Sequence, residues 1–311
     1  MGFTRADTGL SRAISTGAAP QNADPKIGLA HSVVESMLRP YWAANPASVA
    51  ATEMLSEFFP AGALGWDHLA FRTVALPGLG LAALAPVFES LGWTARDDLT
   101  FPAKKLRARW YAPPSPSLPR VFISELIVDE LGAEAARAVR EVCSTVSPAL
   151  AAAHYLDTAT IGGTPWARPT LAQYRAVAAE SEYGAWVLVN GGALNHTTLS
   201  VHAMRGVRDL NDLIQRLEDA GFALNQEGGA AKVSPDGLLC QASTLADNRL
   251  FRFACGAAAL VPSSYIEFAE RKVLPEFAHL PAEQVRDEHR REGFEASNAD
   301  KIFESTFKKA A

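Results

Sequence analysis

The sequence predicts an α+β protein in which two β-α-β-β-β modules pair and curve their sheets around a shared cavity. A repeated order of elements carries this prediction, because a strand, a helix and three further strands occur in each half of the chain. The 311 residues are 48% hydrophobic and 20% charged, which is typical of a globular chain with a sizeable core. No low-complexity linker separates the two copies, so we expect one compact unit.

The first copy opens with DHLAFRTVAL (67–76), where β-branched and aromatic residues alternate with polar ones and predict a strand. The segment LAALAPVFESLGW follows with apolar residues at helical spacing and a glycine near its end, so it predicts a helix. Three strand-like runs come next, and they are TARDDLTF, KKLRARWYA and RVFISELIV.

The second copy opens with NHTTLSVHAM (195–204) and repeats this order. Its helix, RDLNDLIQRLEDAGF, carries a single apolar stripe and is the clearest helix in the chain. The remaining strands are predicted in FALNQEG, in AAKVSPDGLLCQAST around an S-P-D-G turn, and in SSYIEFAERKV.

Flanking and inserted segments complete the predicted organisation. Residues 1–27 are expected to form a flexible tail, and residues 28–128 comprise two helices and the first module. Residues 129–190 are Ala-rich and predict a helical insert that caps the cavity. The second module spans residues 191–271, and residues 272–311 predict a polar helical segment that serves as a lid or a brace.

Composition excludes several classes of protein. A net charge of −5 argues against binding to nucleic acid or anionic lipid, since that affinity comes from clustered Lys and Arg. No apolar run approaches the roughly 20 residues that cross a bilayer, and no secretory signal is evident. Cys143, Cys240 and Cys255 form no CxxC pair, so we expect buried apolar residues in an intracellular, soluble protein.

Two of the seven histidines occupy matching places in the two copies. His68 lies near the start of the first opening strand, and His196 lies near the start of the second. A single histidine on a strand is more often a satisfied core residue, but pseudo-twofold packing brings equivalent positions face to face. Glu267, in the last strand of the second copy, is costly to bury unless it is paired or binds a cation. These three residues form a candidate metal site.

Symmetry adds Glu125, in the last strand of the first copy, as a candidate fourth ligand. The alternative is that Glu125 ends an edge strand in solvent or pairs with a nearby arginine. Two imidazoles and one carboxylate form the facial triad that suits Fe(II) in oxygen chemistry, whereas four ligands favour a Lewis-acid isomerase or lyase. A metal-free protein that binds an organic acid is a further alternative.

Arg72 is a candidate substrate-binding residue. Strand periodicity puts it on the same face as His68, and an inward guanidinium matches a carboxylate. The alternative partner for Arg72 is a buried acid such as Glu125. On the second opening strand the same period aligns His202 with His196, about 20 Å away at ~3.3 Å per residue. That distance excludes a shared metal and leaves His202 as a candidate cavity-lining residue.

The motifs that occur in order between about residues 31 and 307 are DHLAFRT, FPAKKLRA, LPRVFISEL, the segment leading to NHT, KVSPDGLL, SYIEFAER and GFEASNADKIFEST. Together they resemble those of the 2-oxoadipate dioxygenase/decarboxylase, or hydroxyglutarate synthase, family, and most closely its short plant-type branch. The resemblance implies the vicinal-oxygen-chelate, or glyoxalase-like, fold. It also implies Fe(II) held by His68, His196 and Glu267, with Arg72 on the substrate carboxylate.

The activity that the resemblance implies is the conversion of 2-oxoadipate and O₂ to 2-hydroxyglutarate and CO₂ in lysine catabolism, without separate 2-oxoglutarate. The expected partners are therefore a small 2-oxo dicarboxylic acid and O₂, with no nucleic acid and no membrane. The plant-like resemblance makes a plastid the expected compartment if the tail is a transit remnant, and the cytoplasm otherwise.

One stretch, GLLCQASTLAD, departs from the family pattern. Cys240 and Ala242 stand where we expect another apolar residue and a serine. The candidate lining residues that remain are Gln241, Ser243 and Thr244 from this stretch and Tyr265 beside Glu267.

Overall fold

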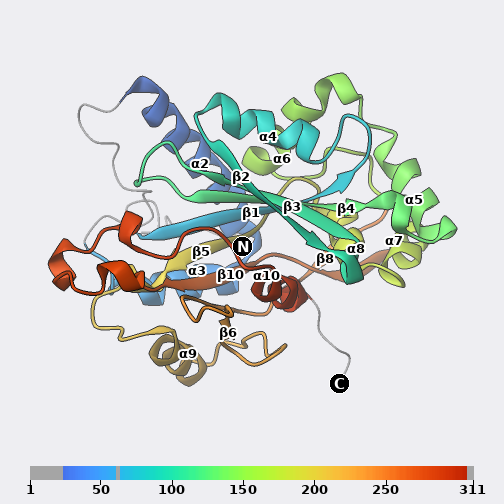
Figure 1. Cartoon of the computed structure of the whole chain (residues 1–311). Helices are drawn as coiled ribbons and strands as arrows, with labels where there is room; N and C mark the ends of the chain where they lie inside the picture. The colour runs from blue at the N-terminus through green and yellow to red at the C-terminus, as the bar shows by residue number, and fades with distance from the viewer. Residues whose placement is uncertain (1–23, 61–63, 307–311) are drawn as a thin grey trace, which may run out of the picture.

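The computed structural model describes residues 24–60 and 64–306. Its centre is an eight-stranded sheet with the strand order β2-β3-β4-β1-β5-β10-β7-β6 (Figure 1). The two opening strands, β1 (Trp66–Ala75) and β5 (Leu194–Ser200), pair antiparallel at the middle of this sheet. Each module therefore occupies one half of the sheet, and the predicted paired β-α-β-β-β architecture is confirmed.

The first module has the predicted order of elements. After β1 come α4 (Leu81–Ser90), β2 (Thr94–Phe101), β3 (Leu106–Ala112) and β4 (Arg120–Ile127). Strand β4 returns parallel to β1, and β3 and β2 add antiparallel toward the edge. The closing strand of the module thus lies beside its opening strand.

The second module mirrors this arrangement. After β5 come α9 (Leu210–Asp219), β6 (Lys232–Val233), β7 (Leu239–Ser243) and β10 (Tyr265–Arg271). Strand β10 lies parallel to β5, and β7 and β6 add antiparallel. The apolar stripe of α9 is buried, which confirms the clearest helix in the sequence.

Two features of the second module differ from the sequence prediction. The prediction of a strand in FALNQEG is wrong. Among the described residues this segment forms only an isolated bridge, from Leu224 to Thr244. The buried Lys232 ammonium accounts for this, since it donates to the carbonyls of Asn225, Gly229 and Ala230 and folds the segment into a loop. A hairpin of β8 (Asn248–Arg252) and β9 (Ala258–Pro262), which the sequence did not reveal, is inserted before β10.

Helices cover the sheet on the side of α4, and one helix from between the modules, α8 (Glu182–Asn190), contacts Arg72 on the opposite face. Helix α2 begins at Pro25, so the predicted tail over 1–27 is too long, and its first 23 residues lie outside the described residues. Figure 1 shows α2 and α6 side by side above the sheet. The helices before the first module are α2 (Pro25–Ala44) and α3 (Pro46–Ser56), and those between the modules are α5 (Ala133–Cys143), α6 (Ala151–Ile161), α7 (Leu171–Ala178) and α8 (Glu182–Asn190).

The segment after β10, predicted as a polar helical segment, is helical only in part. It consists of short 3₁₀ turns, the helix α10 (Ala296–Ile302) and a last turn over Phe303–Thr306. In Figure 1 it runs back in front of the central strands. We call residues 291–306 the C-terminal strap, and its buried side chains include Phe303 and Ile302.

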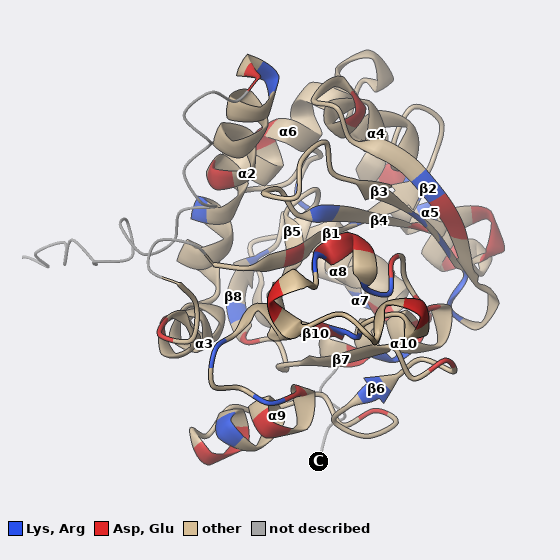
Figure 2. Cartoon of the chain, turned by 60° about the vertical axis from the view of Figure 1, so that its left-hand side comes forward, with Lys and Arg blue, Asp and Glu red and all other residues tan. Residues whose placement is uncertain are grey.

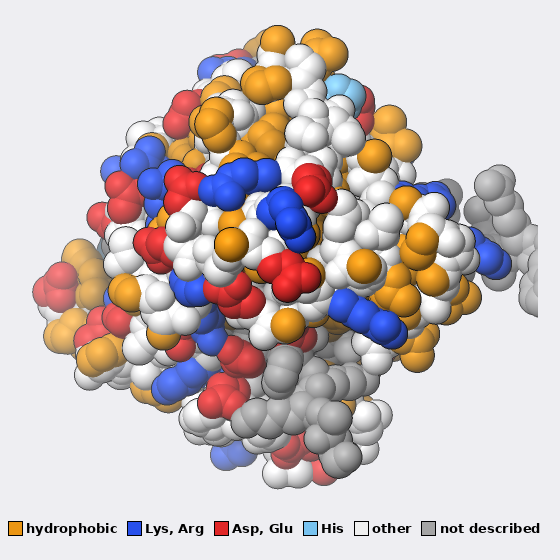
Figure 3. Space-filling view, turned by 90° about the vertical axis from the view of Figure 1, so that its right-hand side faces the viewer, with side chains coloured by type: hydrophobic (Ala, Val, Ile, Leu, Met, Phe, Trp, Pro, Cys, Tyr) orange, Lys and Arg blue, Asp and Glu red, His pale blue; other side chains and the backbone are white. Residues whose placement is uncertain are grey.

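The surface of the molecule carries charged side chains of both signs. In Figure 2 the outer elements α9 and β2 carry both signs of charge, and on the face drawn in Figure 3 acidic and basic side chains are interleaved. None of the described helices is long and apolar enough to span a membrane. Cys143 and Cys240 are buried as expected, whereas Cys255 is exposed in the turn between β8 and β9.

Candidate metal centre

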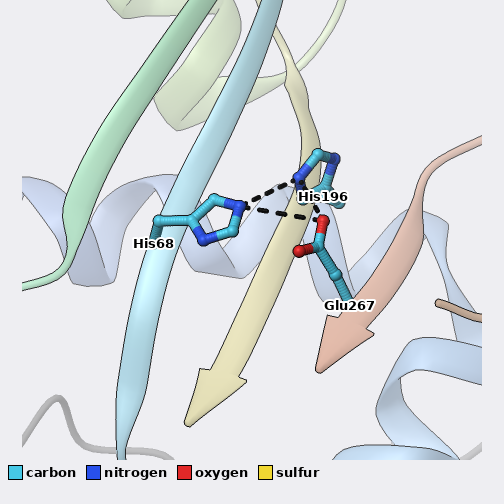
Figure 4. Close-up of side chains that lie close together, drawn as sticks. All are labelled: His68, His196 and Glu267. Carbon is cyan, nitrogen blue, oxygen red and sulfur yellow. Dashed lines mark hydrogen bonds and ion pairs between the residues drawn. The ribbon is translucent and has the colours of Figure 1, made fainter. Parts of the chain in front are cut away.

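Three adjacent strands bring the predicted ligands together. His68 of β1, His196 of β5 and Glu267 of β10 point toward one another (Figure 4). The Nε2 atom of His196 lies 3.3 Å from the Nε2 atom of His68 and 3.0 Å from the Oε2 atom of Glu267, which is 3.7 Å from His68 Nε2. All three residues are buried, and one ligand atom from each lies within 4.8 Å of the others.

Bulges in the β1–β5 ladder orient the side chains of both histidines. The register shifts between Trp66 and His68, which leaves Asp67 as an extra residue, and a second shift leaves Asn195 as the extra residue on β5. Each bulged side chain therefore reaches the histidine that follows it. The Oδ1 atoms of Asp67 and Asn195 both lie 2.9 Å from the Nδ1 atom of the adjacent imidazole.

This arrangement fits a metal cation. Because Nδ1 of each ring donates to a side-chain oxygen, the tautomer places a lone pair on each Nε2 atom, and these lone pairs face each other. The carboxylate oxygen of Glu267 is a third electron-pair donor at the same point. Such a group is repulsive without a positive charge at its centre, whereas a divalent cation satisfies all three donors.

The charge states also suit a metal. Burial lowers the pKa of His196 to about 4, so its imidazole is neutral near pH 7. Burial by itself would raise the pKa of the Glu267 carboxyl, but the imidazoles of His68 and His196 and the Gln241 amide lower it below its usual range. The group therefore offers two neutral nitrogens and one carboxylate.

A hydrogen-bonded chain fixes the Glu267 carboxylate. The Nε2 group of Gln241 donates to Oε1 of Glu267 at 2.7 Å, and the Oε1 atom of Gln241 accepts from Nδ2 of Asn298 at 3.1 Å. Asn298 belongs to α10. The ligand from β10 is thus held, through one intermediate residue, by the C-terminal strap.

A second chain connects His68 to the same strap. The guanidinium of Arg271 donates to both carboxylate oxygens of Asp67, at 2.6 and 2.9 Å, and both residues are buried. Arg271 also donates to the carbonyl oxygens of Arg291 and Gly293. Burial would raise the pKa of Asp67, but Arg271, His68 and Arg120 hold it well below its usual range.

Arg72 lies on the same part of β1, and the strap contacts it directly. Its guanidinium donates to Thr306 Oγ1 at 2.9 Å and to the Phe303 carbonyl at 3.0 Å. Aromatic rings of Tyr183, Trp186 and Phe303 surround it. Its Nε–H group is buried and has no hydrogen-bond partner in the described part of the chain. Arg72 therefore retains an unused donor close to His196, whose pKa it lowers.

The structure does not bring Glu125 to the metal group. Its carboxylate accepts from Arg107 Nε at 2.5 Å and from the backbone N–H of Leu81 at 2.8 Å. In the β1–β4 register Glu125 pairs with Thr73, so it lies on the alternate face from His68 and toward α4. The candidate fourth ligand is therefore corrected to a buried acid that pairs with an arginine and caps a helix.

The other candidate lining residues divide into two groups. The ring of Tyr265 stacks on the His196 imidazole at 4.7 Å, and Ser243 forms a hydrogen bond with Ser305 of the strap. The Thr244 hydroxyl accepts from the backbone of Ile266, and strand β5 ends before His202, which accepts from the Arg271 backbone instead. Of the five candidate lining residues, Gln241 lines the cavity beside the metal group, whereas Ser243, Thr244, Tyr265 and His202 do not.

Apolar side chains close this space. The cavity beside the three ligands is only about 20 Å³ and is lined in part by Phe122, Phe294, Ile302 and Phe303. The Phe294 ring meets the His68 imidazole edge-on at 4.8 Å. The strap therefore covers the open side of the metal group.

Sequence reasoning missed the residues that position the ligands. A signal for two of them is present in the sequence, because Asp67 and Asn195 each directly precede one of the two histidines. A polar residue repeated at this place indicates a side chain that could orient the imidazole. Arg271 and Asn298 gave no comparable signal, because their partners are far away in the sequence.

Comparisons with known proteins identify the family of this chain. The family model described as 2-oxoadipate dioxygenase/decarboxylase matches residues 61–283. The rice enzyme named 2-oxoadipate dioxygenase/decarboxylase, chloroplastic/amyloplastic (Oryza sativa subsp. japonica) is 43% identical over 97% of this chain and 86% of its own. The chain belongs to this family.

Further comparisons extend the match to the fold. The Arabidopsis thaliana enzyme named 2-oxoadipate dioxygenase/decarboxylase, chloroplastic, is 48% identical over 78% of this chain and 68% of its own. The crystal structure of the rice hydroxyglutarate synthase in complex with 2-oxoadipate superposes with a TM-score of 0.87, over 93% of this chain and 95% of the rice chain. The expected family and its paired-module fold are confirmed.

Proposed function

We propose that this protein is an Fe(II)-dependent dioxygenase that converts 2-oxoadipate and O₂ to 2-hydroxyglutarate and CO₂. The convergence of two imidazole Nε2 atoms and one carboxylate oxygen, in a member of this family, carries the proposal. The reaction balances without a separate reductant, because the C1 carboxylate leaves as CO₂ and both atoms of O₂ remain in the products. The rice and Arabidopsis relatives are named for this reaction.

The ligand set supports Fe(II) as the metal. Two histidines and one carboxylate on one face of a metal form the triad of non-heme Fe(II) oxygenases, in which open positions remain for substrate and O₂. His68, His196 and Glu267 would hold the ion, and when bound it would supply the redox chemistry. A fourth protein ligand would favour an isomerase or lyase, and the position of Glu125 removes the residue considered for that role.

The surrounding side chains have distinct proposed tasks. Arg72 would bind a carboxylate of the 2-oxo acid through its free Nε–H group and thereby orient the substrate. The aromatic residues Phe122, Phe294 and Phe303 would exclude water from the reacting atoms. Gln241 and Asp67 would keep the ligands in place throughout the reaction.

Oxygen uptake tests this proposal. Protein loaded anaerobically with Fe(II) is given 2-oxoadipate, and O₂ consumption, CO₂ and 2-hydroxyglutarate are quantified by electrode and mass spectrometry. We expect a 1:1:1 ratio, its loss in His196→Ala, and its retention in His279→Ala, which changes an exposed histidine. No uptake with 2-oxo acids of five to seven carbons, despite bound iron, would overturn the proposal and favour a protein that only binds organic acids.

We also propose a plastid location. Both plant relatives carry chloroplastic in their names. Import of the radiolabelled full chain into isolated chloroplasts tests this, with protease protection as the readout. A chain that remains protease-sensitive outside the organelle would contradict it.

A further inference from the structure

A second and much larger cavity lies away from the metal group. It has a volume of about 740 Å³, and no residue lines both cavities. Its walls come from the C-terminal halves of α2 and α6, the end of α8 and strand β8. In both Figure 1 and Figure 2, α2 and α6 lie next to each other on the helical side of the sheet. This volume falls within the range of ligand-binding cavities, about 300–1,000 Å³.

The cavity carries positive charge without a counter-charge. Arg168, Arg249 and Arg252 line it, and no Asp or Glu does. In the part of the chain that the structure describes, none of these three guanidinium groups forms an ion pair. Arg249 is partly buried and donates only to the neutral oxygens of Val189 and Asn190. Burial lowers the pKa of Arg249, and no acid offsets this effect.

The polar floor of the cavity is already satisfied by the protein. The Oδ1 atom of Asn45 accepts from both Ser263 Oγ and the Ser264 backbone, and the Ser264 hydroxyl donates to the Leu194 carbonyl. The three guanidinium groups therefore remain as the cationic groups that a ligand can contact. The partly buried Arg249 gains most from an anion, because a guanidinium removed from water without a counter-charge is costly. The exposed Arg168 and Arg252 add two further planar groups that match carboxylate and phosphate.

Apolar surface surrounds these arginines. Trp166 and Phe251 line the cavity with buried rings. Leu250, which also lines it, is 62% exposed, and Ile161 beside the lining residue Gly162 is 78% exposed. Large apolar side chains left in solvent next to a cavity favour a ligand with an apolar or aromatic body.

We propose that this cavity binds an organic anion, in which a carboxylate or phosphate contacts Arg168, Arg249 and Arg252 and an apolar body contacts Trp166 and Leu250. The site is separate from the metal centre and does not depend on the function proposed above.

Calorimetric titration of the full-length, metal-loaded protein tests this site. Phenyl phosphate and phenylacetate are the probes, since each joins an aromatic body to one of the two anionic groups, and phenol is the uncharged control. We expect saturable binding of at least one anion and none of phenol. The better probe identifies the anionic group. Absence of saturable binding by both anions overturns the proposal.

Variants place the binding in the cavity. We expect the double variant Arg168→Gln, Arg252→Gln to weaken binding at least ten-fold, because it removes two of the three guanidinium groups proposed to contact the anion. Both arginines are exposed, so the double variant should keep the core intact. Arg137→Gln, which changes an exposed arginine of α5, serves as the matched control and should bind as wild type. His196→Ala should also retain binding. Equal affinity in the double variant, or loss in His196→Ala, would assign the binding elsewhere and contradict the proposal.

Discussion

Asp67 and Asn195 occupy the two bulged positions of the β1–β5 ladder, and each accepts a hydrogen bond from the Nδ1 group of the histidine that follows it. Each module thus orients its histidine ligand by the same hydrogen bond to a bulged residue. They differ in charge, however, because Asp67 is an anion paired with Arg271 and Asn195 is a neutral amide. The His68 imidazole is therefore the more strongly polarised ligand.

Asp67→Asn should weaken metal binding about 10- to 100-fold, because it removes the anionic partner of His68 while keeping the size of the side chain. Competition against a chelating dye measures the metal affinity directly. Asp98→Asn is the matched control, since that acid is on the surface and pairs with Arg109. Unchanged affinity in Asp67→Asn, with an intact circular dichroism spectrum, would show that Asp67 does not support the ligand.

Glu125→Gln should leave metal affinity unchanged and lower the free energy of unfolding by about 1–3 kcal/mol, because a buried carboxylate that accepts charged and backbone donors is lost. Urea denaturation and dye competition on the same preparation separate the two effects. A loss of metal binding without a loss of stability would restore Glu125 as a ligand.

Glu182→Gln should stabilise the protein at pH 8 and have little effect at pH 4. Burial raises the pKa of Glu182 to about 7 from its ordinary 4.5, so the folded state binds more protons than the unfolded state between these values. Stability is therefore lost as the pH rises from 4.5 to 7. Because solvent screens this partly exposed group, we expect the effect on the free energy of unfolding to be about 1–2 kcal/mol.

The readout for Glu182→Gln is the difference in Tm between variant and wild type across this pH range. The matched control is Glu218→Gln, an exposed acid of α9. A difference in Tm that is independent of pH would show that the carboxyl does not titrate in this way.

The C-terminal strap should change its mobility when substrate binds. The cavity beside the ligands, at about 20 Å³, has room for about one water molecule, so 2-oxoadipate requires the strap to move and then to repack. Hydrogen exchange with mass spectrometry should show altered protection over residues 291–306 when substrate is added. Thr306→Val should increase the exchange rate there, because it removes the hydrogen bond with Arg72. Identical exchange with and without 2-oxoadipate would indicate that substrate enters by another route.

Periodicity and internal symmetry in the sequence predict a large part of the site. Strand alternation places His68 and Arg72 on one face, and the repeated order of elements pairs His68 with His196. The first inference needs only the alternation within one strand. The second needs only the order of elements within each module, since the two opening strands, β1 and β5, are equivalent and pair with each other. The ligand pair and the family resemblance therefore follow from the order of the residues alone.

Departures from regular geometry do not follow in this way. Ideal alternation puts Asp67 on the opposite face from His68, and only the bulge brings the two side chains together. Internal symmetry predicts the wrong role for Glu125, because the matching position in the first module faces helix α4 instead of the cavity. Contacts such as Arg72 with Thr306 join residues 234 positions apart, and no local pattern encodes them.

The strap contacts side chains that position the ligands or lie beside them: it accepts hydrogen bonds from Arg271 and Arg72, and Asn298 donates to Gln241. The sheet supplies the three ligands, but their buried surroundings are complete only when the strap is docked against it. The strap is far in sequence from β1, which carries His68, so closing this contact is a long-range step of folding. A molecule whose strap is detached would keep its sheet and hold the three ligands in an unfinished, solvent-exposed centre.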